Sequence, residues 1–239
     1  VIQTGVAVRN VRSGGDGFLI DAGRMGIVSA KSVVLATQPH VAARFLENLD
    51  DDAAAAAGEI KAPPLAVVFL GYRRGQVDHP LDGLGFLTPQ SEGSPLNGAQ
   101  FSSTMFPGRA PEGCVAVTGY FGGARMPDLA GLPESDLIAL ARREFQDLIG
   151  AKGDPIIARV KHWPLGLPQY EIGHLERTAC LKEAEDRRPG LFLTGNYFDG
   201  PSVTACVERA IKTASNVQAH LADKQNINLG KGNLSLAAG

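Results

Sequence analysis

Short apolar blocks separated by glycine-rich turns fill the first 35 residues, and this pattern predicts strands. A Ser-Gly-Gly-Asp-Gly turn at 13–17 follows the alternating positions Val6, Val8 and Val11. The later run 32–35 is apolar after its first residue, Ser32, which is typical of a strand buried on both faces.

Two helices are predicted next. Residues 41–49 carry apolar side chains at helical spacing. The segment 50–58 is acidic at its start and rich in alanine, and negative charge favours a helix N-terminus. Strands followed by helices predict an α/β unit at this end of the chain.

The pattern changes at Lys61-Ala62-Pro63-Pro64, which we take as the first domain boundary. One amphipathic helix is predicted beyond it over 135–149, with Gly150 as its stop signal. The strands predicted in this part of the chain are 65–71, 114–121 and 156–163. Together these elements predict a mixed or antiparallel sheet backed by helices.

The most informative segment is 191–203, where a short apolar strand runs into a Gly195-Asn196 turn, a second glycine and a helix. Such a junction directs backbone N–H groups and a helix N-terminus toward one point, where an anion or a polar ring edge can bind. Ser202 is the predicted N-cap of a helix over 202–222. The stripe that we expect this helix to bury is Val203, Val207, Ala210, Ile211, Ala214, Val217 and Leu221.

Composition excludes several classes of protein. The 239 residues carry a net charge of −2 with no long basic run, so we expect no nucleic-acid partner. Cys114, Cys180 and Cys206 are far apart and the five histidines show no ligand spacing, so we expect neither disulfides nor a metal site. This cysteine usage favours a cytoplasmic location, with peripheral membrane attachment left open.

The two ends of the chain carry less information. The first residues are Val1-Ile2-Gln3, with no initiating Met and no signal peptide, and we interpret the chain as one piece of a larger protein. Residues 223–239 are polar and rich in Gly and Asn, and we expect a flexible tail there.

Six segments carry a family resemblance when they are taken in order. They include a Gly-x-Gly-x-Leu-x-Pro stretch and a Pro-Gln-Tyr-x-x-Gly-His string, and they lie at 33–39, 83–89, 102–109, 122–125, 163–174 and 195–210. Through them, residues 1–222 resemble the C-terminal half of the protoporphyrinogen oxidases, within the flavin-containing amine oxidase superfamily.

The resemblance implies a mixed α/β and α+β fold. Residues 1–60 would be a partial FAD-binding, Rossmann-like domain, and 61–188 a substrate-binding domain with a mixed or antiparallel sheet backed by helices. Residues 189–222 would return to the FAD-binding domain, and 223–239 would be the flexible tail.

The resemblance also implies an activity, the oxidation of a porphyrinogen-type substrate. Hydride would pass to FAD, and O2 or another acceptor would reoxidise the flavin. The residues that match cofactor contacts are Val8, Ala36, Trp163, Gly195, Asn196, Ser202 and Val203. From the residues alone, Val8 could equally be a plain strand residue, Trp163 core filler, and Gly195 a glycine that its turn requires.

Arg125 and Tyr170 are the candidate substrate contacts. Arg125 could hold a propionate through a bidentate pair, or it could form a surface salt bridge. No catalytic residue is identified, because the resemblance implies that flavin accepts the hydride and the substrate nitrogens handle protons. We interpret His174 as a structural hydrogen-bonding residue.

Departures from the family pattern limit what the chain can do alone. It contains no Gly-x-Gly-x-x-Gly loop for the FAD pyrophosphate, and Gln38 and Pro201-Ser202 also differ from the pattern. We expect the chain alone to be inactive, with a missing N-terminal half or a partner chain supplying the loop. The strands of 1–35 and 191–194 would join a parallel sheet centred on that part.

Three alternatives stay open. Exposed strand edges could pair two copies of this chain as a homo-oligomer. The chain could be a non-catalytic porphyrin-binding or scaffold module of the same fold. It could also belong to another flavin enzyme, such as an amine oxidase or a carotenoid desaturase.

Overall fold

Backbone contacts divide the chain into two units in the computed structural model, which describes the backbone of residues 1–235 and the side chains to residue 223. The flanking unit comprises residues 1–61 and the chain from Pro168 onward, and the inserted unit comprises residues 62–167. The first division falls beside the predicted boundary. The second falls before the predicted limit at residue 188, because helix α5 (His174–Arg187) packs on helix α2 (Asp51–Gly58) of the flanking unit.

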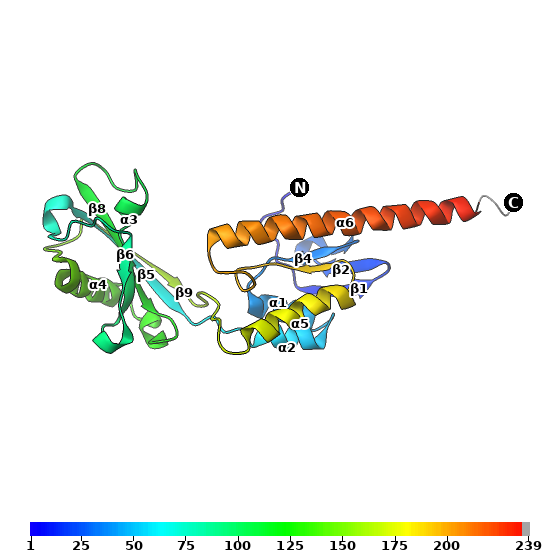
Figure 1. Ribbon diagram of the computed structural model, residues 1–239, viewed down its shortest axis with the longest axis horizontal. Coiled ribbons are helices and arrows are strands. Elements are labelled where there is room, and N and C mark those ends of the chain that lie inside the picture. The colour runs from blue at the N-terminus through cyan, green and yellow to red at the C-terminus, as the bar shows by residue number, and fades with distance from the viewer. Residues whose placement is uncertain (236–239) are drawn as a thin grey trace. The chain divides into compact units, whose positions relative to one another are not determined.

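The strands of the flanking unit form an antiparallel sheet and a separate parallel pair (Figure 1). The antiparallel sheet comprises β1 (Asn10–Gly14), β2 (Gly17–Asp21) and β3 (Ile27–Ala30), which begin after Val6 and Val8. The parallel pair joins β4 (Val33–Leu35) to β10 (Leu191–Leu193). Our expectation that all the early strands join the parallel sheet was therefore wrong for β1 to β3, because strands joined by short turns pair antiparallel.

Helices α1 (Pro39–Leu46), α2 and α5 close the core of the flanking unit. Asp50 caps α2 by accepting a hydrogen bond from the Ala53 N–H at 3.0 Å, and its carboxylate also pairs with Arg187 of α5 at 2.8 Å. The buried apolar residues that these elements share are Val11, Phe18, Leu35, Ala42, Phe45, Leu46, Leu49, Ala53, Ala57, Ile60, Leu181, Ala184, Leu191, Leu193, Tyr197 and Phe198.

Helix α6 (Val203–Ser235) exposes much of the stripe that we predicted to be buried. Val203 is 81% exposed, Val207 52% and Ile211 64%, whereas Arg209 and Thr213 are the buried positions. The prediction was wrong because apolar periodicity identifies the face that a helix can bury, and no described element covers this face. The helix also continues through residues 223–235, where we predicted a flexible tail, and residues 236–239 lie outside the described residues.

The inserted unit contains a five-stranded antiparallel sheet in the order β6-β7-β8-β5-β9, whereas the sequence predicted a mixed or antiparallel sheet and only the strands that correspond to β5, β8 and β9. Helix α4 (Glu134–Ile149) packs on one face and ends at Gly150, whose φ of 65° is left-handed, and the short α3 (Ser102–Met105) packs on β8. The strands are β5 (Leu65–Arg73), β6 (Gly85–Leu87), β7 (Leu96–Gln100), β8 (Cys114–Gly122) and β9 (Ile157–Trp163).

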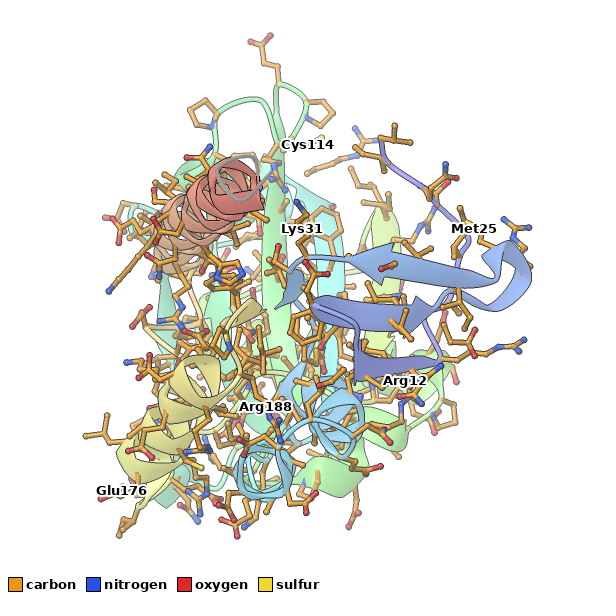
Figure 2. All side chains as sticks on the ribbon, turned by 90° about the vertical axis from the view of Figure 1, so that its right-hand side faces the viewer. Arg12, Met25, Lys31, Cys114, Glu176 and Arg188 are labelled. Atoms are coloured by element: carbon orange, nitrogen blue, oxygen red, sulfur yellow. The ribbon has the colours of Figure 1, made fainter. Side chains whose placement is uncertain are left out.

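Short 3-10 helices complete the described elements. They are η1 (Gly23–Met25), η2 (Arg74–Gln76), η3 (Gln90–Glu92) and η4 (Pro127–Gly131). Figure 2 shows Met25 at the turn after β2, where its side chain is 47% exposed. Among the helices of residues 1–235, none combines the length and the apolar character needed to cross a membrane.

Candidate cofactor site

The parallel pair β4–β10 brings two predicted cofactor segments to one edge. Leu35 lies beside Leu193, and the Thr194 N–H donates to the Leu35 carbonyl at 3.1 Å. Ala36 therefore follows β4 beside the point where Gly195 and Asn196 follow β10. The carboxyl ends of adjacent parallel strands are where open α/β sheets bind ligands.

Two polar side-chain atoms at this edge lack partners. Thr37 Oγ1 and Gln38 Oε1 are buried and have no hydrogen-bond partner within the described residues. Buried polar atoms are normally hydrogen-bonded, so each unpaired atom calls for a partner outside the described residues. Both residues follow β4 closely, so these unpaired polar atoms lie at the candidate site.

The turn after β10 requires glycine at two positions, one for lack of space and one for its backbone conformation. A Cβ on Gly195 would lie 2.5 Å from the Tyr197 ring, so no larger residue fits without a shift of that buried ring. Gly200 has a φ of 135°, which L side chains rarely adopt. The glycines therefore allow a compact turn whose backbone is accessible at the edge of the sheet.

Helix α6 begins where this turn ends. Ser202 Oγ accepts a hydrogen bond from the Ala205 N–H at 3.1 Å, which confirms the predicted N-cap. The first N–H groups of a helix have no intrahelical acceptor, and the helix dipole adds partial positive charge there. The exposed Val203 thus marks a point that favours negative charge.

Tyr170 and His174 hold two successive carbonyls of the turn. Tyr170 Oη donates to the Asn196 carbonyl at 2.6 Å, and His174 Nε2 lies 2.8 Å from the Tyr197 carbonyl. Since a carbonyl only accepts, His174 carries its proton on Nε2 in this contact. The two rings stack with centroids 4.2 Å apart, and burial raises the pKa of Tyr170.

This contact bears on two predictions. His174 is 5% exposed and bonded to backbone, which agrees with our interpretation of it as a structural residue. Tyr170 was predicted to touch substrate, and the structure places its hydroxyl against the turn. Its substrate role stays a prediction.

A buried arginine and a half-buried glutamate bond to Leu193, the last residue of β10, and sequence reasoning missed both. Arg209 of α6 donates to the Leu193 carbonyl at 3.1 Å, pairs with Asp199 at 3.3 Å and lies 3.9 Å from the Phe198 ring centroid. Glu185 of α5 accepts from the Leu193 N–H at 2.6 Å, and burial raises the pKa of its carboxyl. Arg209 lies on the polar side of the α6 pattern, so only the tertiary contacts reveal its burial.

Val8 helps to line an apolar groove beside β4. The groove encloses about 390 Å³ and reaches from Val8 past β4 to Thr37. Its other lining residues are Val11, Ile20, Val33, Val34, Leu35, Val41, Arg44 and Phe45. The structure thus brings Val8 to the strand that carries Ala36, although Ala36 itself is not part of the lining.

The other two predicted site residues belong to the inserted unit. Trp163 is 47% exposed at the end of β9 and helps to line a groove of about 520 Å³. Arg125 donates to the Thr88 carbonyl at 2.7 Å and to the Ser94 carbonyl at 3.5 Å. Its guanidinium is therefore partly engaged with backbone, and its role toward a propionate stays a prediction.

Within the part of the chain that the structure describes, no three His, Cys, Asp or Glu side chains gather as metal ligands would. The site combines two strand ends, a glycine turn and a helix N-terminus, an arrangement that is typical of the ligand-binding edge of nucleotide-binding α/β proteins.

Comparison with known proteins identifies the family. Residues 1–218 match the family described as Flavin containing amine oxidoreductase, and the chain belongs to this family. It is 36% identical over 208 residues to the chloroplastic protoporphyrinogen oxidase of Oryza sativa subsp. japonica, an alignment that covers 82% of this chain and 39% of that protein. It is 25% identical over 222 residues to coproporphyrinogen III oxidase of Bacillus subtilis, covering 92% of this chain and 47% of that protein.

A solved structure agrees on the fold. Cyclohexylamine oxidase from Brevibacterium oxydans aligns with a TM-score of 0.67 at 15% identity, covering 90% of this chain and 48% of that chain. The chain thus spans less than half the length of the relatives that it matches. The family and the mixed α/β fold confirm the resemblance seen in the sequence.

Proposed function

We propose that this chain is part of an FAD-dependent oxidoreductase that oxidises a porphyrinogen. The observation that carries the proposal is the joint position of Ala36, Gly195 and the α6 N-terminus at one edge of the sheet. Family membership supports a flavin, and the relatives named as protoporphyrinogen and coproporphyrinogen oxidases support the substrate class.

The residues at this edge fit FAD. Gly195 and Asn196 would lie near its pyrophosphate or ribityl part, and Ser202 and Val203 near the flavin ring. Val8 and Ala36 would meet its adenosine end, with the orphaned Thr37 hydroxyl as an added hydrogen-bonding group. When bound, FAD would supply the hydride acceptor.

The chain's own groups prepare the site for that acceptor. The N-terminus of α6 would stabilise negative charge on a flavin bound beside it, because the first N–H groups of a helix lack intrahelical acceptors and the helix dipole is positive at that end. Tyr170 and His174 keep the turn carbonyls of Asn196 and Tyr197 fixed, which leaves the turn in one geometry for binding. No side chain is assigned a proton-transfer step.

We also propose that the exposed stripe of α6 packs against the polypeptide that supplies the phosphate-binding loop. Val203, Val207 and Ile211 form a continuous apolar row, and Val34 on β4 is 41% exposed beside an open strand edge. Relatives more than twice as long as the aligned segment contain additional chain that could occupy it. If the 239-residue chain elutes as a clean monomer in size-exclusion chromatography, with no copurifying partner, the result would count against this proposal and against a homo-oligomer.

The proposed function is tested on the complete reading frame that contains this chain. The purified protein should carry FAD, identified after its release, and should convert a non-fluorescent porphyrinogen to a fluorescent porphyrin. Gly195→Ala should weaken FAD binding because its Cβ meets the Tyr197 ring, whereas Gly75→Ala should not, since nothing lies within 4 Å of a Cβ there. A complete protein without flavin refutes the proposal.

A non-catalytic porphyrin-binding module of the same fold is the second candidate. The absence of a Gly-x-Gly-x-x-Gly loop from the 239 residues favours it. It is preferred if the complete reading frame also lacks that loop while the protein binds porphyrin without flavin. The cytoplasmic location stays a prediction, and several plant relatives are named as chloroplastic or mitochondrial proteins.

A further inference from the structure

The sheet of the inserted unit has an apolar side that is not packed into its core. The even-numbered residues of β5 from 66 to 72 point into the core beneath α4. Successive residues of a strand alternate between faces, so Leu65, Val67 and Phe69 lie on the opposite side, where they are half-buried. A sheet face that meets only water is normally polar, so this apolar row indicates an apolar ligand or neighbour.

The strand register adds aromatic and cationic side chains to the same side. Val67 lies between Tyr120 of β8 and Lys161 of β9. Cross-strand neighbours on one side have Cβ atoms only about 4.5–5.5 Å apart, so their side chains form one surface. We call it the open sheet face, and it comprises Leu65, Val67, Phe69, Tyr120, Arg159, Lys161 and Trp163.

The two cations on this face have no anionic partner. Arg159 Nη1 donates to the carbonyl of its neighbour Ala158 at 2.7 Å, and Lys161 Nζ lies 5.1 Å from the Trp163 ring centroid. Neither forms an ion pair with any carboxylate of the described residues. They are two positions apart on an extended strand, which separates them by about 7 Å along the strand axis.

We propose that the open sheet face binds a tetrapyrrole by its apolar ring, with Arg159 and Lys161 holding its carboxylates. Charge complementarity selects this occupant, because an apolar, aromatic surface bordered by two free cations matches an apolar ring that carries carboxylates. The proposal rests on the proposed function for the substrate class. It assigns the carboxylate contact to Arg159 and Lys161 of β9 in place of Arg125. The guanidinium of Arg125 already donates to two backbone carbonyls.

The 239-residue chain carries its own reporter for the test. Trp163 is the sole tryptophan and lies on the open sheet face, so a porphyrin bound there should quench its emission. Protoporphyrin IX is titrated into the wild-type chain, and its dimethyl ester is titrated in parallel. The free acid should bind about tenfold more tightly than the ester, because only its carboxylates can form charge-assisted hydrogen bonds.

Charge-removing variants locate the contact. Arg159→Gln combined with Lys161→Gln should weaken binding of the free acid by about tenfold and leave binding of the ester unchanged. Arg143→Gln is the matched control, since Arg143 is exposed on α4, which packs on the other side of the sheet. Circular dichroism checks that each variant folds, and the porphyrin absorbance shift gives a reading independent of tryptophan.

Three results would overturn the proposal. They are no Trp163 quenching by either porphyrin, equal affinity for acid and ester, and unchanged affinity in the double variant. In the last two cases the cations of β9 only protect an edge strand from pairing with other chains. Since this titration needs no flavin, its failure is distinct from finding no FAD on the complete protein.

Discussion

Replacing Tyr170 by Phe tests whether the turn at the cofactor site is held from the segment before α5. The substitution removes the hydroxyl that donates to the Asn196 carbonyl at 2.6 Å and keeps the ring that stacks on His174. A neutral hydrogen bond contributes about 0.5–1.5 kcal/mol net. Since Tyr170 is 46% exposed, water can reach the freed carbonyl, and we expect a loss of about 1 kcal/mol.

Hydrogen exchange of the amides in residues 195–205 measures this loss directly. A change of about 1 kcal/mol in local opening should raise their exchange rates about fivefold. Exchange in the strands of the inserted unit should not change. The measurement requires no flavin, so it reports on the turn itself.

Tyr120→Phe is the matched control. It also removes a tyrosine hydroxyl bonded at 2.6 Å, to Gln100 in the inserted unit. The turn should therefore exchange at the wild-type rate in this variant. The reasoning is refuted if Tyr170→Phe leaves the turn unchanged, or if Tyr120→Phe accelerates it equally.

Three further variants test other contacts. Arg187 lowers the pKa of Asp50, and stability from this pair is lost as pH falls through that lowered pKa. Urea unfolding should show Asp50→Asn less stable by about 1–2 kcal/mol near neutral pH, with the difference shrinking below about pH 4. Burial raises the pKa of Glu185, so wild-type stability falls as pH rises from the ordinary glutamate pKa of about 4 through the raised pKa of the folded state, and Glu185→Gln should gain relative stability over that interval. Val207→Glu with Ile211→Glu should change the stability of the chain by less than about 0.5 kcal/mol while preventing association with the loop-bearing polypeptide in a pull-down.

For each of these variants, one result would contradict the prediction. A pH-independent deficit in Asp50→Asn would mean that the charge of Asp50, and therefore its ion pair with Arg187, is not the source of the lost stability. If the free energy of unfolding of Glu185→Gln varies with pH in the same way as that of wild type, burial does not raise the pKa of Glu185. Lys212→Glu, on an exposed part of α6 outside the stripe, should leave association intact, and equal loss in both variants would indicate a general charge effect.

Local chemistry made several elements predictable from the sequence. The Gly150 stop and the Ser202 cap depend on residues within one helical turn, and both are present in the structure. The strand, glycine turn and helix after Leu191 could be predicted for the same reason. The antiparallel sheet of the inserted unit followed from strand blocks separated by turns.

What the sequence concealed depends on contacts between distant residues. Helix α5 has a mostly polar surface and few fully buried positions, so no apolar stripe indicates it. Arg209 is buried and Glu185 is half-buried, and both bond to Leu193, whose strand lies between their helices in the sequence. The exposed stripe of α6 shows the opposite case, in which a clear apolar pattern finds no described partner.

The pairing of β4 with β10 costs less entropy if the inserted unit, which separates them in the sequence, folds first. The chain must bring Leu35 and Leu193 together across the whole inserted unit, residues 62–167. The two ends of that unit are already joined by the Gly166 N–H, which donates to the Pro63 carbonyl at 3.1 Å. If the inserted unit folds first, it shortens the loop that β4 and β10 must close to roughly a third, which lowers the entropic cost by about 1 kcal/mol. Folding of the inserted unit before the flanking unit would therefore bring β4 and β10, the two strands at the cofactor edge, close together before they pair.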